Sequence, residues 1–265
     1  MTFLIEQYAR TAAPVVWDDL DLASSFAERP LSAGALRVLR YMSDVESYTV
    51  CYLRDLLVTP SHNDPDITTF LTMWNYEEYW HGEALAEVLG AHGIPTGTNH
   101  LRDVRVRQGI KAKTGPVKQL LLASLAGEDF IATHMTWGAI NEWSTHAGYV
   151  ALTRNEDHPV LTELLRRIIK QETRHVAFYT SQARARLQAS PRARRLTRLA
   201  LRFAWQPVGS GVMPEEEVRF MLTYLMGGTD GRAAAQKVDQ KIDSLPGLDG
   251  LGLVERALDR HGVPR

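Results

Sequence analysis

The segment Glu78-Tyr79-Trp80-His81 and its later counterpart Glu172-Thr173-Arg174-His175 decide the fold that this sequence predicts. They are the only Glu-x-x-His matches in a sequence with nine histidines. Apolar residues recur around both at three- and four-residue steps, which is typical of an amphipathic helix. A three-residue step places glutamate and histidine on the same helix face, one turn apart. Each segment therefore predicts a helix that directs a carboxylate and an imidazole towards one point.

The rest of the chain predicts an all-α fold, because alternating strand patterns are scarce. Two of the helices begin with a capping residue followed by proline, at Asp64-Pro65 and at His158-Pro159. Two others carry Glu46 and Glu142 on faces that are otherwise apolar. The four long helices are predicted over about residues 33–58, 64–90, 117–153 and 159–189.

The spacing of the acids predicts that they meet at one height. Glu46 and Glu78 lie 32 residues apart about a turn near His62, and Glu142 and Glu172 lie 30 apart about a turn near Glu156. Since a helix rises about 1.5 Å per residue, each acid stands roughly 21–24 Å from its turn, near the middle of a bundle. Residues 91–116 are predicted to form a long link that climbs the bundle. Two hairpins joined by one long crossover predict a ferritin-like four-helix bundle.

Shorter helices are predicted beyond this core, at about residues 192–205, 214–226, 231–242 and 253–260. Clusters of glycine and proline separate them. We therefore predict a single domain over residues 1–265, with a metal-binding bundle core at about 33–189 and accessory helices at about 190–265. The accessory helices either wrap the bundle or build a dimer contact.

Composition is that of an ordinary globular protein of 265 residues with a net charge of −1. This balance gives no reason to expect nucleic acid as a partner. No run of apolar residues is long enough to predict insertion into a membrane. The single cysteine, Cys51, excludes an intrachain disulfide and a cysteine-based metal site. We therefore expect a cytoplasmic protein.

A metal centre is predicted where the four long helices meet. Carboxylate oxygens mixed with imidazole suit iron, with manganese in one or both sites as the alternative. Burying four carboxylates and two imidazoles without a cation would cost several kcal/mol per charge. The other interpretation is a hydrogen-bonded Glu–His network in a helical core. The predicted ligands are Glu46, Glu78, His81, Glu142, Glu172 and His175.

Neighbouring polar residues are weaker candidates. Glu77 and Glu83 flank the first segment but face elsewhere, towards solvent or an ion pair between helices. Glu128 is either an acid close to the ligands or a polar contact near the start of its helix. His134 and His146 are expected to be satisfied or exposed histidines that bind no metal.

The stretch Trp74-Asn75-Tyr76-Glu77-Glu78-Tyr79-Trp80-His81-Gly82 resembles the first metal motif of the soluble acyl-acyl carrier protein desaturases. Lys170-Gln171-Glu172-Thr173-Arg174-His175 resembles their second motif, and the likeness covers roughly residues 36–182. The resemblance implies a diiron centre, the six ligands above, and an oxygen-dependent reaction that introduces a double bond into a carrier-bound fatty acyl chain during lipid biosynthesis. It also implies a catalytic role for Thr145 in handling oxygen and protons.

The same resemblance implies an acyl carrier protein and a ferredoxin-type electron donor as partners, and we expect a homodimer. Acyl carrier proteins are acidic, so the basic run formed by Arg192, Arg194, Arg195 and Arg198 is a candidate docking surface. A solvated helix face explains this run equally well. Gln171 departs from the family, which has aspartate there on a route from a surface tryptophan to a metal-bound histidine. Glutamine keeps the hydrogen bond but carries no charge.

Two other functions remain open at this point. One keeps the diiron site but uses it in a hydroxylase or N-oxygenase of a small molecule in a specialised pathway. The other is a non-enzymatic ferritin-like metal-binding protein.

Overall fold

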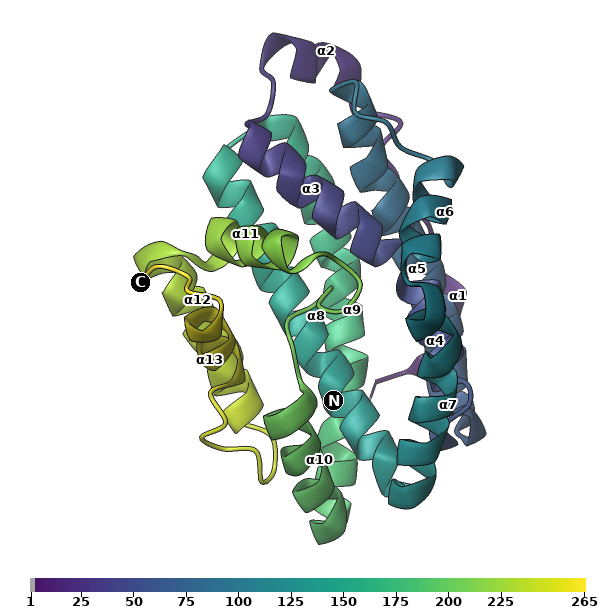
Figure 1. Ribbon diagram of the computed structural model, residues 1–265. Coiled ribbons are helices and arrows are strands. Elements are labelled where there is room, and N and C mark those ends of the chain that lie inside the picture. The colour runs from purple at the N-terminus through teal and green to yellow at the C-terminus, as the bar shows by residue number, and fades with distance from the viewer. Residues whose placement is uncertain (1–2) are drawn as a thin grey trace.

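The structure, a computed structural model, describes residues 3–265, and it describes side chains except at positions 98, 99, 107, 110–113, 115, 116, 118, 119 and 122. The prediction of an all-α chain is confirmed, since the described residues form helices and no strand (Figure 1). Within the same residues, no helix combines the length and the apolar character that crossing a membrane requires.

Four long helices supply the predicted metal ligands: α3 (Ala33–Glu46), α5 (Pro65–Ala91), α8 (Asp129–Glu156) and α9 (Pro159–Ala189). Helix α8 packs along α9, α3 packs on α5, and α5 also contacts α9. Figure 1 shows α8 and α9 running side by side through the centre of the molecule. Their facing sides hold a core of large buried side chains, so the polar cluster described below is surrounded by apolar packing.

The predicted starts of α5 and α9 are present. The Asp64 side chain accepts hydrogen bonds from the backbone amides of Asp66 and Ile67, and Pro65 is the first residue of α5. His158 caps α9 in the same way, immediately before Pro159. These caps satisfy amides that the first helical turn leaves without partners.

The prediction of one continuous helix over residues 33–58 is wrong. Helix α3 ends at Glu46, and a separate helix, α4 (Thr49–Leu56), begins after a two-residue break. The Thr49 hydroxyl donates to the Glu46 carbonyl at 2.7 Å, and such a bond competes with the helical backbone bond. Helix α5 also approaches closely here, since a Cβ on Gly82 would lie 2.7 Å from Ser47 Oγ.

Residues 91–116, which were predicted as a long link between the two hairpins, are helical for most of their length. They contain α6 (Thr98–Arg107) and the start of α7 (Gly109–Ala126). The third long helix begins at Asp129 instead of residue 117, because Gly127 has a φ of +62° that interrupts the helix. Glycine and threonine are common in loops, but this segment also contains lysine, arginine and glutamine, which are good helix formers.

The four accessory helices lie within three residues of their predicted bounds. Helix α10 packs on α8 and α9, α11 packs on α3 and α8, and α12 packs on α8 and α13. They therefore cover the side of the bundle that α8 exposes (Figure 1). Their bounds are α10 (Pro191–Ala204), α11 (Glu215–Met226), α12 (Gly228–Asp243) and α13 (Leu253–Arg260).

Two short N-terminal helices were not predicted. Both α1 (Ile5–Thr11) and α2 (Leu22–Glu28) have seven residues and pack against α5. Helices of this length are marginal by themselves, so tertiary contacts hold them and their sequence signal is weak. Helix α1 buries one side chain, Tyr8, which reaches the polar cluster.

Candidate metal centre

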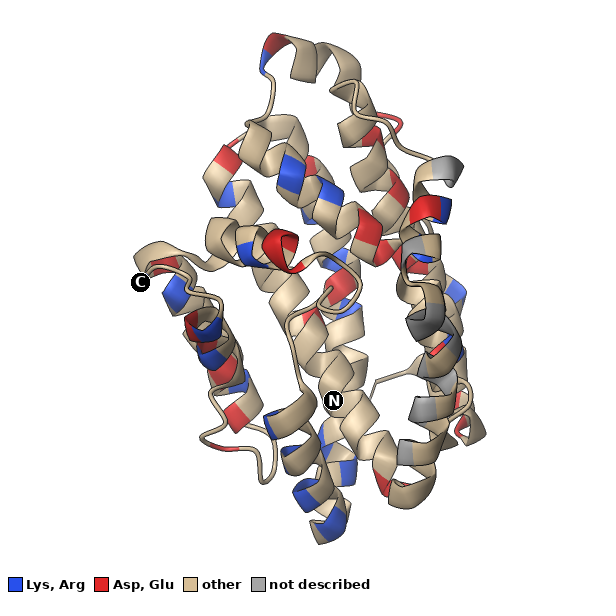
Figure 2. Ribbon diagram, viewed as in Figure 1, with Lys and Arg blue, Asp and Glu red and all other residues tan. Residues whose placement is uncertain are grey.

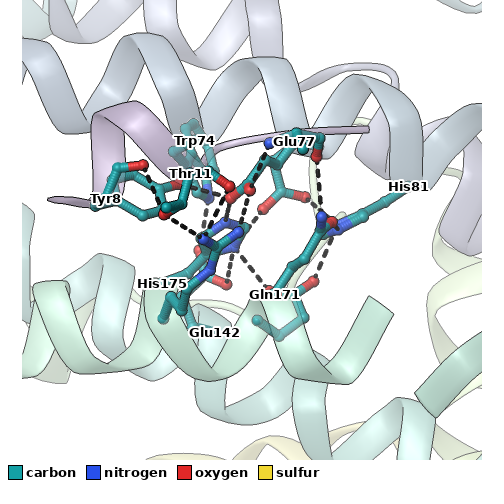
Figure 3. A network of polar contacts seen from close by, with 12 residues as sticks. Tyr8, Thr11, Trp74, Glu77, His81, Glu142, Gln171 and His175 are labelled. Carbon is teal, nitrogen blue, oxygen red and sulfur yellow. Dashed lines mark hydrogen bonds and ion pairs between the residues drawn. The ribbon is translucent and has the colours of Figure 1, made fainter. Parts of the chain in front are cut away.

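The structure brings the six predicted ligands together, buried, where α3, α5, α8 and α9 meet (Figure 3). Candidate ligand atoms of Glu78, Glu142, Glu172 and His175 all lie within 4.8 Å of one another. Those of Glu46, Glu78 and His81 form a second group by the same criterion. Glu78 belongs to both groups, so two cations bound by these residues would be adjacent and would share its carboxylate.

Two glutamates lie between the two imidazoles. Glu78 places Oε1 3.1 Å from His175 Nδ1 and Oε2 3.5 Å from His81 Nδ1. Glu172 places Oε2 3.0 Å from His175 Nδ1 and Oε1 3.4 Å from His81 Nδ1. Each carboxylate thus offers one oxygen to each side, as a ligand that bridges two ions does.

The other two glutamates lie at the ends of this row, each held by a buried donor. Tyr149 donates its hydroxyl to Glu46 Oε1 at 2.7 Å. Trp74 donates its indole N–H to Glu142 Oε1 at 3.0 Å. One oxygen of each carboxylate is therefore fixed in place, which orients the group. Nothing in the sequence alone predicts these contacts of Trp74 and Tyr149.

The outward nitrogens of both histidines donate to oxygen acceptors. His81 Nε2 donates to Gln171 Oε1 at 2.7 Å, and His175 Nε2 donates to Glu77 Oε2 at 2.8 Å (Figure 3). With its remaining proton on Nε2, each imidazole would offer the Nδ1 lone pair to a cation in the cluster, which is the tautomer that binds a metal. Gln171 therefore keeps the contact to histidine that the resemblance implied.

Glu77 corrects one expectation. It does not face solvent, since its side chain is fully buried and bonded to His175. The alternative, an ion pair between helices, is present, because Arg174 of α9 contacts the Glu77 carboxylate. The pKa of Glu77 is lowered, since the bonds from His175, Tyr8 and Arg174 outweigh the effect of burial. The only sequence signal for Glu77 is that it directly precedes Glu78.

Two buried atoms of the cluster show that a cation fits. Among the described residues, His81 Nδ1 and Glu172 Oε1 find no hydrogen-bond partner, and they lie 3.4 Å apart. A buried polar atom left in this state costs about 1–3 kcal/mol. A cation bound between them would satisfy both. Four carboxylates and two imidazoles are the donor set of dinuclear iron and manganese sites in helical bundles.

The electrostatics of the cluster also favour positive charge. Burial, together with the neighbouring Glu78 charge, raises the pKa of Glu46 well above its usual value. Burial and the charges of Glu172 and Glu78 do the same to the pKa of Glu142. Burial would lower the pKa of His81, but Glu172 and Glu78 outweigh it and raise that pKa to about 9. Glu46 and Glu142 therefore attract protons, which a dication can replace. Burial would also raise the pKa values of Glu78 and Glu172, but hydrogen bonds from Glu46 to Glu78, and from the histidines to both, outweigh it and lower them.

A cavity of about 440 Å³ reaches the carboxylates of the cluster. All four glutamates line it and neither histidine does, while Thr145, Trp137 and Tyr179 form part of its wall. A smaller apolar pocket of about 60 Å³ continues past Thr145 and Glu46, enclosed by side chains of α11 and α13. The structure therefore places Thr145 one turn beyond Glu142, where both spaces meet.

The arginines of α10 are largely engaged within the chain. Figure 2 shows Lys and Arg gathered along this helix. Arg192 pairs with Asp129 at 3.1 Å, and Arg194 and Arg198 donate to backbone carbonyls at 2.8 and 2.9 Å. Three of the four arginines in the predicted docking run thus make contacts within the chain, and Arg195 is exposed.

The remaining candidates lie outside the cluster. His134 is buried, and its Nδ1 lies 2.7 Å from Ser61 Oγ. Burial lowers the pKa of His134 to about 3, so this imidazole is neutral. Its Nε2 finds no hydrogen-bond partner among the described residues, so the expectation of a satisfied histidine holds for Nδ1 alone. His146 and Glu83 are half-buried, and Glu128 is exposed at the start of α8.

Comparison of the chain with protein-family models, curated proteins and solved structures finds no match. The chemistry of the cluster and its cavity therefore carries the functional argument.

Proposed function

We propose that this protein is a diiron, oxygen-dependent oxidase built on a ferritin-like bundle. The observation that carries the proposal is the pair of overlapping ligand groups, Glu78-Glu142-Glu172-His175 and Glu46-Glu78-His81, beside a cavity that reaches only their carboxylates. Bound iron would supply the reduction of dioxygen and the removal of hydrogen from a carbon of the substrate. Manganese in one or both sites is the alternative that the same ligands accept.

The chain's own residues would have separate tasks. The four glutamates and two histidines hold the ions, and the buried donors Tyr149 and Trp74 keep the end carboxylates oriented. The cavity would hold the substrate against the carboxylate face, between walls that include Trp137 and Tyr179. Thr145 lies where the cavity and the apolar pocket meet, and its hydroxyl would handle protons beside the cluster.

The first candidate substrate is a carrier-bound acyl chain, into which the enzyme would introduce a double bond. The apolar pocket beyond Thr145 supports it, since its walls include Met221, Leu222 and Leu225. An acyl carrier protein, a ferredoxin-type electron donor and a homodimer belong to this proposal. Exposed Arg195 would take part in docking the acidic carrier.

The second candidate is hydroxylation or N-oxygenation of a compact small molecule. The cavity wall favours it, because Asn141, Gln206 and Asp55 add polar groups that an acyl chain would not use. Binding sites for polar small molecules combine apolar walls with a few such groups.

The test is to load the protein with Fe²⁺ without oxygen, reduce it, and admit oxygen with a panel of acyl carriers and amine or aromatic small molecules. Mass spectrometry reads the products. The first candidate predicts an acyl product lighter by two hydrogens, and the second predicts a product heavier by one oxygen. Thr145→Val should keep both metals but lose most of the product, while Glu142→Ala should lose metal and product together. Iron uptake with no product from any substrate, in particles of many copies by light scattering, would favour iron storage instead.

A further inference from the structure

The N-terminal segment Tyr8–Ala13, here called the N-terminal strap, lies over the histidine side of the cluster (Figure 3). At its first residue, the Tyr8 hydroxyl donates to Glu77 Oε2 at 2.7 Å. The same oxygen accepts from His175 Nε2 at 2.8 Å. Tyr8 is therefore linked to His175 through a single carboxylate oxygen.

The other end of the strap reaches the second histidine. The Ala13 carbonyl accepts from Gln171 Nε2 at 2.9 Å, and Gln171 Oε1 accepts from His81 Nε2 at 2.7 Å. The Ala13 amide also donates to Glu77 Oε1 at 3.4 Å. One short segment thus contacts the outer hydrogen-bond partner of each histidine.

Arg174 closes the strap onto the bundle. Its guanidinium donates to the carbonyl and the hydroxyl of Thr11 at 3.3 and 3.2 Å, and also contacts the Glu77 carboxylate. It lies 5.1 Å from the centre of the Tyr8 ring. Glu77 therefore contacts the strap and two residues of α9, Arg174 and His175.

The strap has one buried side chain, Tyr8, whose ring lies 5.4 Å from that of Phe70 and 6.3 Å from that of His175. Apolar side chains before and after the strap also pack against the core, namely Phe3, Ile5 and Val15. A seven-residue helix has little stability of its own, so these apolar contacts and the polar contacts to Glu77 and Gln171 together keep the strap docked.

We propose that the N-terminal strap positions both histidines for metal binding, and that strap docking and metal binding stabilise each other. The proposal rests on the metal centre proposed above. A metal on Nδ1 requires the proton to stay on Nε2. His175 donates that proton to Glu77, and His81 donates it to Gln171. The strap in turn contacts the Glu77 carboxylate and the Gln171 side-chain nitrogen. Coupling between two binding events is reciprocal, so each must strengthen the other.

The first experiment measures amide hydrogen exchange over residues 5–16 of the full-length protein, with and without two equivalents of Mn²⁺. If strap docking is coupled to metal binding, amide exchange in this segment should be slower when metal is bound. Unchanged exchange in a protein that binds both equivalents would overturn the inference and leave the metal centre standing. A wild-type protein that binds no Mn²⁺ or Fe²⁺ would overturn the proposed function as well.

The second experiment measures the two Mn²⁺ affinities by chelator competition and electron paramagnetic resonance. Tyr8→Phe should weaken one equivalent about 10-fold, and Gln171→Ala should weaken the other about 10–100-fold, because partners of metal-bound histidine typically contribute on this scale. Gln7→Ala, at an exposed position of the same helix, should change neither. If Tyr8→Phe lowered only the melting temperature and left both affinities unchanged, the strap would be structural and the inference wrong.

Discussion

The two sides of the buried cluster differ in how their polar atoms are used. On the histidine side, both Nε2 atoms are bonded, and the N-terminal strap covers their partners. On the carboxylate side, all four glutamates line a cavity. Under the proposed function, one side would hold the ions in a fixed geometry and the other would admit a reactant. Substrate would then enter or leave without disturbing the histidines.

The largest expected effect comes from removing a carboxylate that both sides share. Glu78→Gln should reduce the bound iron from two ions per chain to one or none, because Glu78 faces both imidazoles. Metal analysis after anaerobic loading measures this. Glu87→Gln, at an exposed position on the same helix, is the matched control and should keep both ions. Full loading of the Glu78 variant would mean that the ions bind elsewhere.

A smaller effect is expected from a donor on the carboxylate side. Tyr149→Phe removes the bond to Glu46 and should weaken metal binding about 10–100-fold. Tyr179→Phe is the control, because its buried hydroxyl has no hydrogen-bond partner among the described residues, and metal affinity should stay unchanged. Chelator competition compares the two. Equal losses in both variants would show that orientation of Glu46 does not matter.

A packing change can alter the cavity wall without touching a ligand. A Cβ on Gly138 would lie 2.2 Å from the Tyr179 ring, so Gly138→Ala should destabilise the protein by about 1–3 kcal/mol. At Gly148 on the same helix, the nearest atom, on Leu225, is 3.3 Å away. Gly148→Ala should therefore cost less, and the better helix propensity of alanine offsets part of that cost. Urea unfolding measures both, and a larger loss at Gly148 would contradict the packing described here.

The smallest expected effect is the contribution of His134, a buried histidine outside the cluster, to the pH dependence of stability. The pKa of His134 is about 3 in the folded protein against an ordinary 6.5. Below pH 6.5 the unfolded chain binds a proton that the folded chain does not, so stability falls as pH decreases towards 3. From pH 7 to 5.5 the expected loss is about 1 kcal/mol. Urea unfolding should show that His134→Gln lacks this component, and an identical pH dependence would refute it.

Sequence predicted the parts of this molecule that depend on helical periodicity. Glu78 with His81, and Glu172 with His175, share a helix face because of their spacing, and equal distances from two turns placed Glu46 and Glu142 at the same height. The proline-led helix starts were also predicted, since capping is a local interaction.

Contacts between distant segments outside the predicted ligand set were not predicted. Glu77 was misplaced because its partners, Tyr8 and His175, are far away in sequence, and periodicity describes only one helix at a time. The strap was missed for the same reason. The break after Glu46 depends on the Thr49 hydroxyl and on the close approach of Gly82, and neither leaves a mark on the apolar pattern.

The central claim is most directly tested by anomalous diffraction at the iron edge on crystals of protein loaded with Fe²⁺. Two peaks should appear, one next to His81 Nδ1 and one next to His175 Nδ1, both flanked by Glu78 and Glu172. A loaded crystal with no peak at this level, or with peaks bound through Nε2, would contradict the account.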